Sequence, residues 1–185
     1  MIRPDWDETF MDTAELMRKR STCLRRQVGA VVVKDNRMIS ASYNGTPPGF
    51  KHCDEAGCLR EQLGVPSGER HEICRGLHAE MNAILQVAIL GGQSIQGTTM
   101  YTTYLPCSIC ARLIASVGIA RVVFGGGYPD EFAENILQTA GVKLHVYTQK
   151  VVGQTLREGG IRDERTIAPA ELEAGSTTRL HYTEG

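Results

Sequence analysis

Apolar and polar positions along the chain follow two periods, one typical of helices and one typical of strands. Near the N-terminus, apolar residues recur at helical spacing: Trp6, Phe10, Ala14 and Met17. They predict a helix over about residues 6–19, with Asp5 and Glu8 in the arrangement of a capping box. The apolar run 28–33 and the alternating run 38–43 flank a short polar turn, so they predict the two strands of a hairpin.

The second half of the chain alternates between the two patterns. Three further helices and three further strands are predicted there, the helices over 79–90, 106–116 and 131–139, and the strands over 99–103, 121–124 and 143–147. Strands that alternate with helices pair in parallel through right-handed crossovers. The full order, α-β-β-α-β-α-β-α-β, predicts an α/β protein whose five-stranded mixed sheet carries helices on both faces.

Two regions lack either period. Residues 50–77 are irregular and rich in cysteine and histidine, which suggests an insertion that something other than periodicity keeps ordered. Residues 151–185 are polar and carry no motif, so a short packed helix and a mobile tail are both open for them. We therefore expect one domain over residues 1–150, with the insertion at about 50–77, and a C-terminal extension of unknown role.

Composition narrows the class of protein. The chain has 185 residues, of which 42% are hydrophobic and 22% charged, as in ordinary globular domains. Its net charge is −1 with no basic run, which argues against a nucleic-acid polymer as partner but allows a small nucleotide. Neither a targeting segment nor a membrane span is evident, so we expect a cytoplasmic protein. Its six cysteines then favour metal ligands or free thiols over disulfides.

Two short motifs carry the candidate chemistry. His78 and Glu80 begin one predicted helix, and Cys107 and Cys110 follow Pro106 at the start of the next. One imidazole and two thiolates supply the three protein ligands of a catalytic zinc with an open fourth position, which leaves Glu80 free to carry protons. A lone C-x-x-C could be a redox pair, and a lone histidine a packed core residue. Together and in this order, the motifs match the H-x-E…P-C-x-x-C signature of zinc deaminases.

The residues around the motifs add further detail. Three stretches are distinctive: Tyr43-Asn44-Gly45, His78-Ala79-Glu80-Met81-Asn82-Ala83-Ile84, and Met100-Tyr101 before the cysteine pair. With them the chain resembles the deoxycytidylate (dCMP) deaminases of the zinc-dependent cytidine/deoxycytidylate deaminase family, bacterial and phage type. The resemblance implies a three-layer α/β/α fold over about residues 6–150. It also implies hydrolytic deamination of dCMP to dUMP and ammonia, which would supply dUMP for dTMP synthesis.

The resemblance also implies roles for individual residues. Glu80 would be the catalytic base and acid beside a zinc held by His78, Cys107 and Cys110. The residues predicted to bind the substrate are Asn44, Ala79, Arg26 and Tyr128. Arg26 and Tyr128 are chosen, like Arg25, only because their residue types can donate hydrogen bonds to a phosphate. Some relatives carry a second, structural zinc, and the residues that match best are Cys23, Cys53, His71 and Cys74. Cys58 could replace Cys53, and reduced, buried cysteines are the alternative.

Regulation and assembly follow from the resemblance alone. Members of the family are typically homohexamers, activated by dCTP and inhibited by dTTP, with Mg²⁺ accompanying the effector. Two alternatives stay open: a deaminase of another nucleotide, nucleoside or base, and a non-catalytic, zinc-stabilised protein of the competence type. The intact Glu80 weighs against the second, because a purely structural zinc site has no use for an adjacent carboxylate.

Overall fold

The computed structural model describes residues 3–127 and 130–148. The predictions for Tyr128 and for residues 151–185 lie outside the described residues. No helix in this described part is long and apolar enough to cross a bilayer. Its helices and strands are α1 (Trp6–Arg18), β1 (Gly29–Lys34), β2 (Arg37–Tyr43), α2 (Cys53–Ala56), α3 (Leu59–Gln62), a 3₁₀ turn (His71–Ile73), α4 (Ala79–Leu90), β3 (Thr99–Thr102), α5 (Ser108–Ser116), β4 (Arg121–Phe124), α6 (Glu131–Thr139) and β5 (Lys143–Val146).

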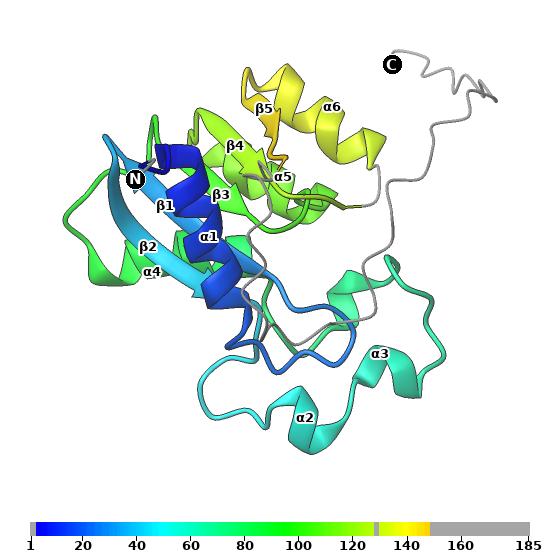
Figure 1. Cartoon of the computed structure of the whole chain (residues 1–185). Helices are drawn as coiled ribbons and strands as arrows, with labels where there is room; N and C mark the ends of the chain where they lie inside the picture. Colours follow the sequence, from blue (N-terminus) through cyan, green and yellow to red (C-terminus); the bar gives the residue numbers. More distant parts are fainter. Residues whose placement is uncertain (1–2, 128–129, 149–185) are drawn as a thin grey trace, which may run out of the picture. The chain divides into compact units, whose positions relative to one another are not determined.

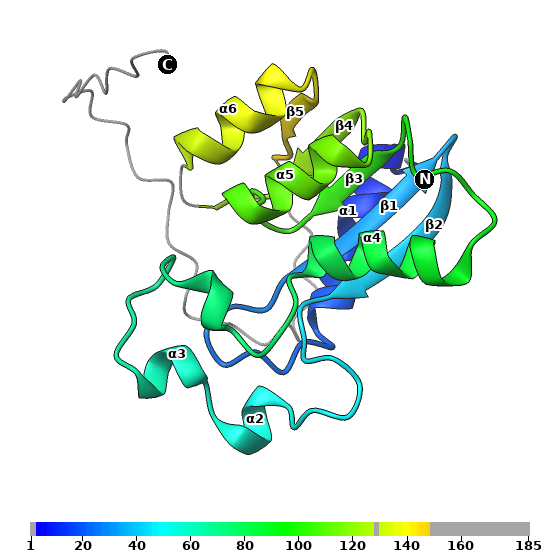
Figure 2. The same ribbon diagram turned by 180° about the vertical axis from the view of Figure 1, so that it is seen from behind.

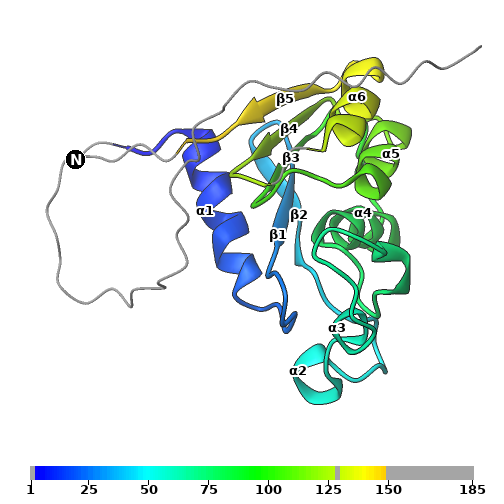
Figure 3. The same ribbon diagram turned by 90° about the vertical axis from the view of Figure 1, so that its right-hand side faces the viewer.

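One five-stranded sheet organises these elements, with the strand order β2-β1-β3-β4-β5 (Figure 1). β1 runs antiparallel to both β2 and β3, whereas β3, β4 and β5 are parallel to one another. The edge-on view in Figure 3 shows α1 on one face of the sheet and α4, α5 and α6 on the other. The predicted three-layer α/β fold with a mixed five-stranded sheet is therefore confirmed.

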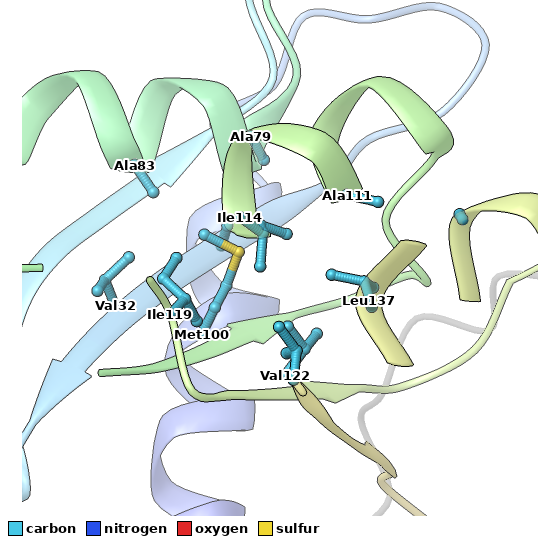
Figure 4. Packing of buried hydrophobic residues seen from close by; sticks show 12 residues of the cluster. Val32, Ala79, Ala83, Met100, Ala111, Ile114, Ile119, Val122 and Leu137 are labelled. Carbon is cyan, nitrogen blue, oxygen red and sulfur yellow. The ribbon is translucent and has the colours of Figure 1, made fainter. Parts of the chain in front are cut away.

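Alternate residues of the strands build two separate cores. On one face of the sheet, Val31 and Val33 of β1 pack with Phe10 of α1. On the other face, Ala30 and Val32 contribute to the core beneath α4, α5 and α6, which the view from behind brings forward (Figure 2). Because successive strand residues point to opposite faces, a single apolar run can serve both cores. The second core is drawn in Figure 4, with helix residues Ala79, Ala83, Ile114 and Leu137.

Two backbone features fix the hairpin and its packing. Asp35 and Asn36 in the turn have φ angles of 46° and 57°, the left-handed pair of a type I′ turn, which matches the twist of the strands it joins. At the start of β1, a Cβ atom on Gly29 would lie 2.0 Å from the carbonyl oxygen of Ala14. Glycine there lets α1 approach the sheet closely.

Besides one-residue shifts at several element ends and an unpredicted 3₁₀ turn, the elements differ from the sequence predictions in two places. α5 begins at Ser108, two residues after the predicted start at Pro106, because Cys107 takes the extended N-cap conformation. α2 and α3 were not predicted. Each has only one turn, which is too short to show a helical period in the sequence.

An ion pair joins α1 to the sheet. Asp7 accepts hydrogen bonds from both terminal nitrogens of Arg121, at 2.8 and 2.5 Å, and from the Tyr101 hydroxyl at 2.7 Å. The hydrogen bond from Arg121 lowers the pKa of Asp7, although partial burial opposes this shift. The carboxylate therefore stabilises the folded state above its unfolded pKa, which is near 3.8.

We expect Asp7→Asn to reduce the free energy of unfolding by about 1–2 kcal/mol at pH 7, as for a partly exposed bidentate pair. This difference should shrink as the pH falls below about 4, because the wild-type carboxyl is then protonated too. Urea unfolding of both proteins from pH 7 to pH 3 measures it, with the exposed Asp12→Asn on the same helix as control. A difference that stays constant over this range would exclude the ion pair as its cause.

Candidate active site

The N-termini of two helices carry the first group of predicted site residues. His78 is the N-cap of α4 and Cys107 the N-cap of α5, both with extended backbone and without a side-chain cap hydrogen bond. Their side chains are therefore available for other contacts. Glu80 and Cys110 lie in the first turns of the same helices. The positive ends of both helix dipoles favour negative charge on the thiols and the carboxyl group.

The distances among these residues fit a zinc ion. Nδ1 of His78 lies 3.4 Å from Sγ of Cys107 and 3.4 Å from Sγ of Cys110. Zinc–nitrogen and zinc–sulfur bonds of ordinary length in a tetrahedron separate the two ligand atoms by about 3.5 Å. Two groups of three potential ligand atoms lie within 4.8 Å of one another: one joins His78 and Cys107 with His71, and the other joins His78 and Cys110 with Glu80. The structure thus brings the three predicted ligands together around His78 Nδ1.

Glu80 is buried beside these ligands. Only 4% of the residue is exposed, and one carboxylate oxygen lies 3.7 Å from Sγ of Cys110. Burial raises the pKa of Glu80 above its ordinary value. A buried carboxyl group with a raised pKa can both accept and release a proton during a reaction.

The two thiols differ in their affinity for protons. The hydrogen bond with Cys110, and then that with His78, lowers the pKa of Cys107 to about 3 despite its burial. The pKa of Cys110 is raised by the hydrogen bond with Cys107 and by burial. The pair therefore favours the thiolate form at Cys107, which is the form in which a cysteine binds a metal.

His78, Glu80 and Cys107 line a cavity of about 150 Å³, whose walls also include Asn44, Ala79 and Arg26. The Asn44 amide accepts a hydrogen bond from the backbone N–H of Val28 and donates one to the carbonyl of Arg26, both at 2.8 Å. It therefore holds the segment after α1 in place as well as lining the cavity. The carbonyl of Ala79 accepts a hydrogen bond from the Ser42 hydroxyl at 2.6 Å.

Three arginines, Arg25, Arg26 and Arg60, contribute to the same cavity wall. The Arg26 guanidinium lies 4.8 Å from the ring centroid of Tyr104. Nη1 of Arg25 and Nε of Arg60 are buried and have no hydrogen-bond partner within residues 3–127 and 130–148. Arg60, which is 8% exposed, and Tyr104 were not predicted as site residues. Arg60 comes from the short helix α3 in the insertion, and nothing in its sequence neighbourhood indicated that it would reach this cavity.

The residues predicted to bind a second zinc are divided between two places. Burial raises the pKa of the Cys53 thiol, and the nearby thiols Cys23 and Cys74, then Cys58, add to this effect. These cysteines are free. His71 instead contacts the first group, with Nδ1 at 3.1 Å from Nε2 of His78. Cys58 therefore lies with the other cysteines of the predicted set, while His71 lies beside the predicted catalytic ligands.

Comparison with known proteins identifies the family. Residues 4–126 match the model of the cytidine and deoxycytidylate deaminase zinc-binding region. The chain belongs to this family. The match contains both motifs that carry the resemblance seen in the sequence, and it confirms that resemblance.

Individual members of the family extend the comparison. The deoxycytidylate deaminase of Mycobacterium phage D29 is 43% identical over 67% of this chain and 97% of its own length. The deoxycytidylate deaminase of Schizosaccharomyces pombe is 40% identical over 79% of this chain. This chain spans about half of the yeast protein, 45% of its length. The crystal structure of the dCMP deaminase from cyanophage S-TIM5 in complex with dCMP and dUMP has a TM-score of 0.66. It is 32% identical over 80% of this chain and all of that one.

Proposed function

We propose that this protein deaminates dCMP hydrolytically to dUMP and ammonia, and so supplies dUMP for dTMP synthesis. The observation that carries the proposal is the buried Glu80 beside His78, Cys107 and Cys110, at a cavity lined by arginines. The similarity to deoxycytidylate deaminases from phage and yeast supports the choice of substrate. The zinc-binding family model supports the choice of metal.

The residues divide the reaction between them. His78, Cys107 and Cys110 hold the zinc, which when bound lowers the pKa of water and so supplies the nucleophile. Glu80 takes a proton from the attacking water and passes it to N3 of the cytosine ring. The second proton of the water goes by the same carboxylate to the amino group at C4, which leaves as ammonia while the C4 carbonyl forms.

The unpartnered arginine nitrogens support a monophosphate as substrate. A buried guanidinium N–H without an acceptor costs about 1–3 kcal/mol or more, because the group has lost its hydration. Nη1 of Arg25 and Nε of Arg60 are both in this condition, and both arginines line the cavity. Phosphate oxygens would satisfy both, as charge-assisted hydrogen bonds. A free nucleoside would leave both nitrogens unsatisfied. Arg26 stays a predicted substrate contact, as does Tyr128, which lies outside the described residues.

We expect Arg60→Gln to raise the KM for dCMP about 10- to 100-fold, the effect of losing one charge-assisted hydrogen bond of about 1.5–3 kcal/mol. Turnover of deoxycytidine, which lacks the phosphate, should change little. Steady-state ammonia release on both substrates measures this, with the exposed Arg37→Gln on β2 as control. Equal losses on both substrates would show that Arg60 acts on the loop it holds through Pro66 and not on the phosphate.

The main alternative is a deaminase of another nucleotide, nucleoside or base. Ammonia release by the zinc-loaded protein from dCMP, deoxycytidine, dCTP and cytosine distinguishes the substrates. Turnover confined to dCMP is the expected result. Preference for the nucleoside or the base would overturn the role given to the arginines. If a folded, zinc-loaded protein released no ammonia from any of the four substrates, a non-catalytic role of the competence type would be favoured.

The remaining predictions rest on the resemblance. We propose that residues 1–150 form the deaminase domain, that the protein is a cytoplasmic homohexamer, and that dCTP activates and dTTP inhibits it with Mg²⁺. Light scattering with and without each nucleotide tests the assembly and the effectors together. For a second, structural zinc, the proximity of Cys23, Cys58 and Cys74 to Cys53 favours a site made of cysteines.

A further inference from the structure

His71 makes two hydrogen bonds that leave neither ring nitrogen free. Its Nδ1 lies 3.1 Å from Nε2 of His78, and its Nε2 lies 2.7 Å from the carbonyl oxygen of Gly68. The two rings meet edge to face, with centroids 5.0 Å apart and an interplanar angle of 72°.

We propose that His71 is a positioning residue that fixes the tautomer and orientation of His78 as a zinc ligand. The inference rests on the proposed function only in taking His78 as that ligand. It assigns His71 to the catalytic metal and not to a second zinc.

With both rings neutral, one arrangement of protons satisfies the two contacts of His71. The carbonyl oxygen of Gly68 can only accept, so Nε2 of His71 carries a proton and donates it. In a neutral imidazole, Nδ1 of His71 is then the acceptor, and Nε2 of His78 must be the donor. When His78 is a neutral metal ligand, its Nδ1 therefore carries no proton. That atom faces Cys107 and Cys110, each 3.4 Å away, and its lone pair is the one a metal needs.

The loop that carries His71 is held in place. Arg70 has a left-handed φ of 50° and Gly68 has a φ of 87°, so the chain turns sharply on both sides of the Glu69 position. The 3₁₀ turn that begins at His71 closes with a hydrogen bond from the Cys74 N–H to the His71 carbonyl at 3.1 Å. The carbonyl of Pro66 is also bound by Arg60, at 3.3 Å. The Gly68 carbonyl therefore lies in a turn that hydrogen bonds hold in place, as it must if it is to fix the position of His71.

Direct ligation of a second zinc by His71 would break one of its two hydrogen bonds, to His78 or to Gly68. Either ring nitrogen of His71 would have to leave its present partner before it could bind a metal. The cysteines around Cys53 already include Cys58 as a fourth thiol, so that group does not depend on His71. If His71 positions His78, a substitution that keeps a hydrogen-bond acceptor should preserve zinc binding. If His71 ligates a second zinc, the same substitution should lose that zinc, because the new side chain is a poor zinc ligand.

The test compares His71→Ala with His71→Asn. The Oδ1 atom of asparagine can occupy the place of Nδ1 and accept the proton of His78, whereas alanine cannot. We expect zinc affinity to fall about 10- to 100-fold in His71→Ala and to stay within a few-fold of the wild type in His71→Asn. Competition with a chelator measures the affinity for the catalytic zinc, which is identified as the zinc that is lost in Cys107→Ala. The exposed His145→Ala is the control.

Three results would overturn the assignment. The alanine variant could keep wild-type affinity, both variants could lose one whole equivalent of zinc in the same way, or asparagine could fail to rescue. If His71→Ala does not fold, nitrogen NMR of the histidine rings in the zinc-loaded wild type decides. A protonated Nε2 and an unprotonated, metal-free Nδ1 in His71 are expected. A metal-bound nitrogen in His71 would contradict the proposal, whatever substrate the enzyme turns over.

Discussion

Glu80→Gln is expected to lower the turnover of dCMP by on the order of 10³- to 10⁴-fold, the upper part of the range for losing a general acid and base. The amide has almost the same shape as the carboxyl group but cannot accept and release a proton near neutral pH. Because the three zinc ligands are other residues, the zinc content should stay that of the wild type. Ammonia release and metal analysis on the same sample measure both.

Stability provides an independent check on this variant. Glu80 is almost fully buried, and burial disfavours its charged form, so a neutral amide should fold at least as well. The control is Glu61→Gln, which removes an exposed carboxylate from α3 and should leave turnover unchanged. Substantial activity in a zinc-loaded Glu80→Gln protein would show that another group moves the protons.

Cys107→Ala is expected to abolish detectable turnover by removing zinc itself. The site would keep His78 and Cys110, but two ligands bind zinc far more weakly than three. Metal that binds only the folded state stabilises it by about 2.7 kcal/mol when free zinc exceeds the dissociation constant 100-fold. The melting temperature of the wild type should therefore drop on addition of a chelator, whereas that of Cys107→Ala should drop less.

Ser108→Ala is the matched control for this prediction. It removes a polar atom next to Cys107, at the first residue of α5, but no proposed ligand. Its zinc content, turnover and response to the chelator should be those of the wild type. If Cys107→Ala retained the same chelator-sensitive zinc as the wild type, Cys107 would not be a ligand of that zinc.

Local sequence patterns were sufficient to predict the positions of most helices and strands. The helix over Ala79–Leu90 and the strand over Arg121–Phe124 have the bounds predicted from the sequence. In both, apolar periodicity and flanking glycines or polar residues act over a few neighbouring positions. The start of α5 was misplaced by two residues, because the extended conformation of Cys107 depends on where its side chain must reach.

The environments of the individual site residues were less accessible from the sequence. Asn44 was predicted as a substrate contact, and its amide also holds the backbone at Arg26 and Val28. That second task depends on how the segment between α1 and β1 returns past the end of β2. Arg60 and His71 lie in the irregular insertion, where no period indicates which way a side chain points.

The sequence by itself determined the family, the order of the elements and the four residues with the proposed chemistry. Within each pair, His78 with Glu80 and Cys107 with Cys110, the residues lie two or three positions apart at one helix start, so their placement relative to each other is local, whereas the meeting of the two pairs depends on the packing of α4 and α5. Only the tertiary structure decided that His71 faces His78 and that Arg25 and Arg60 line the same cavity. These contacts join segments far apart in the chain, and their geometry follows from the packing of the whole domain rather than from any local propensity.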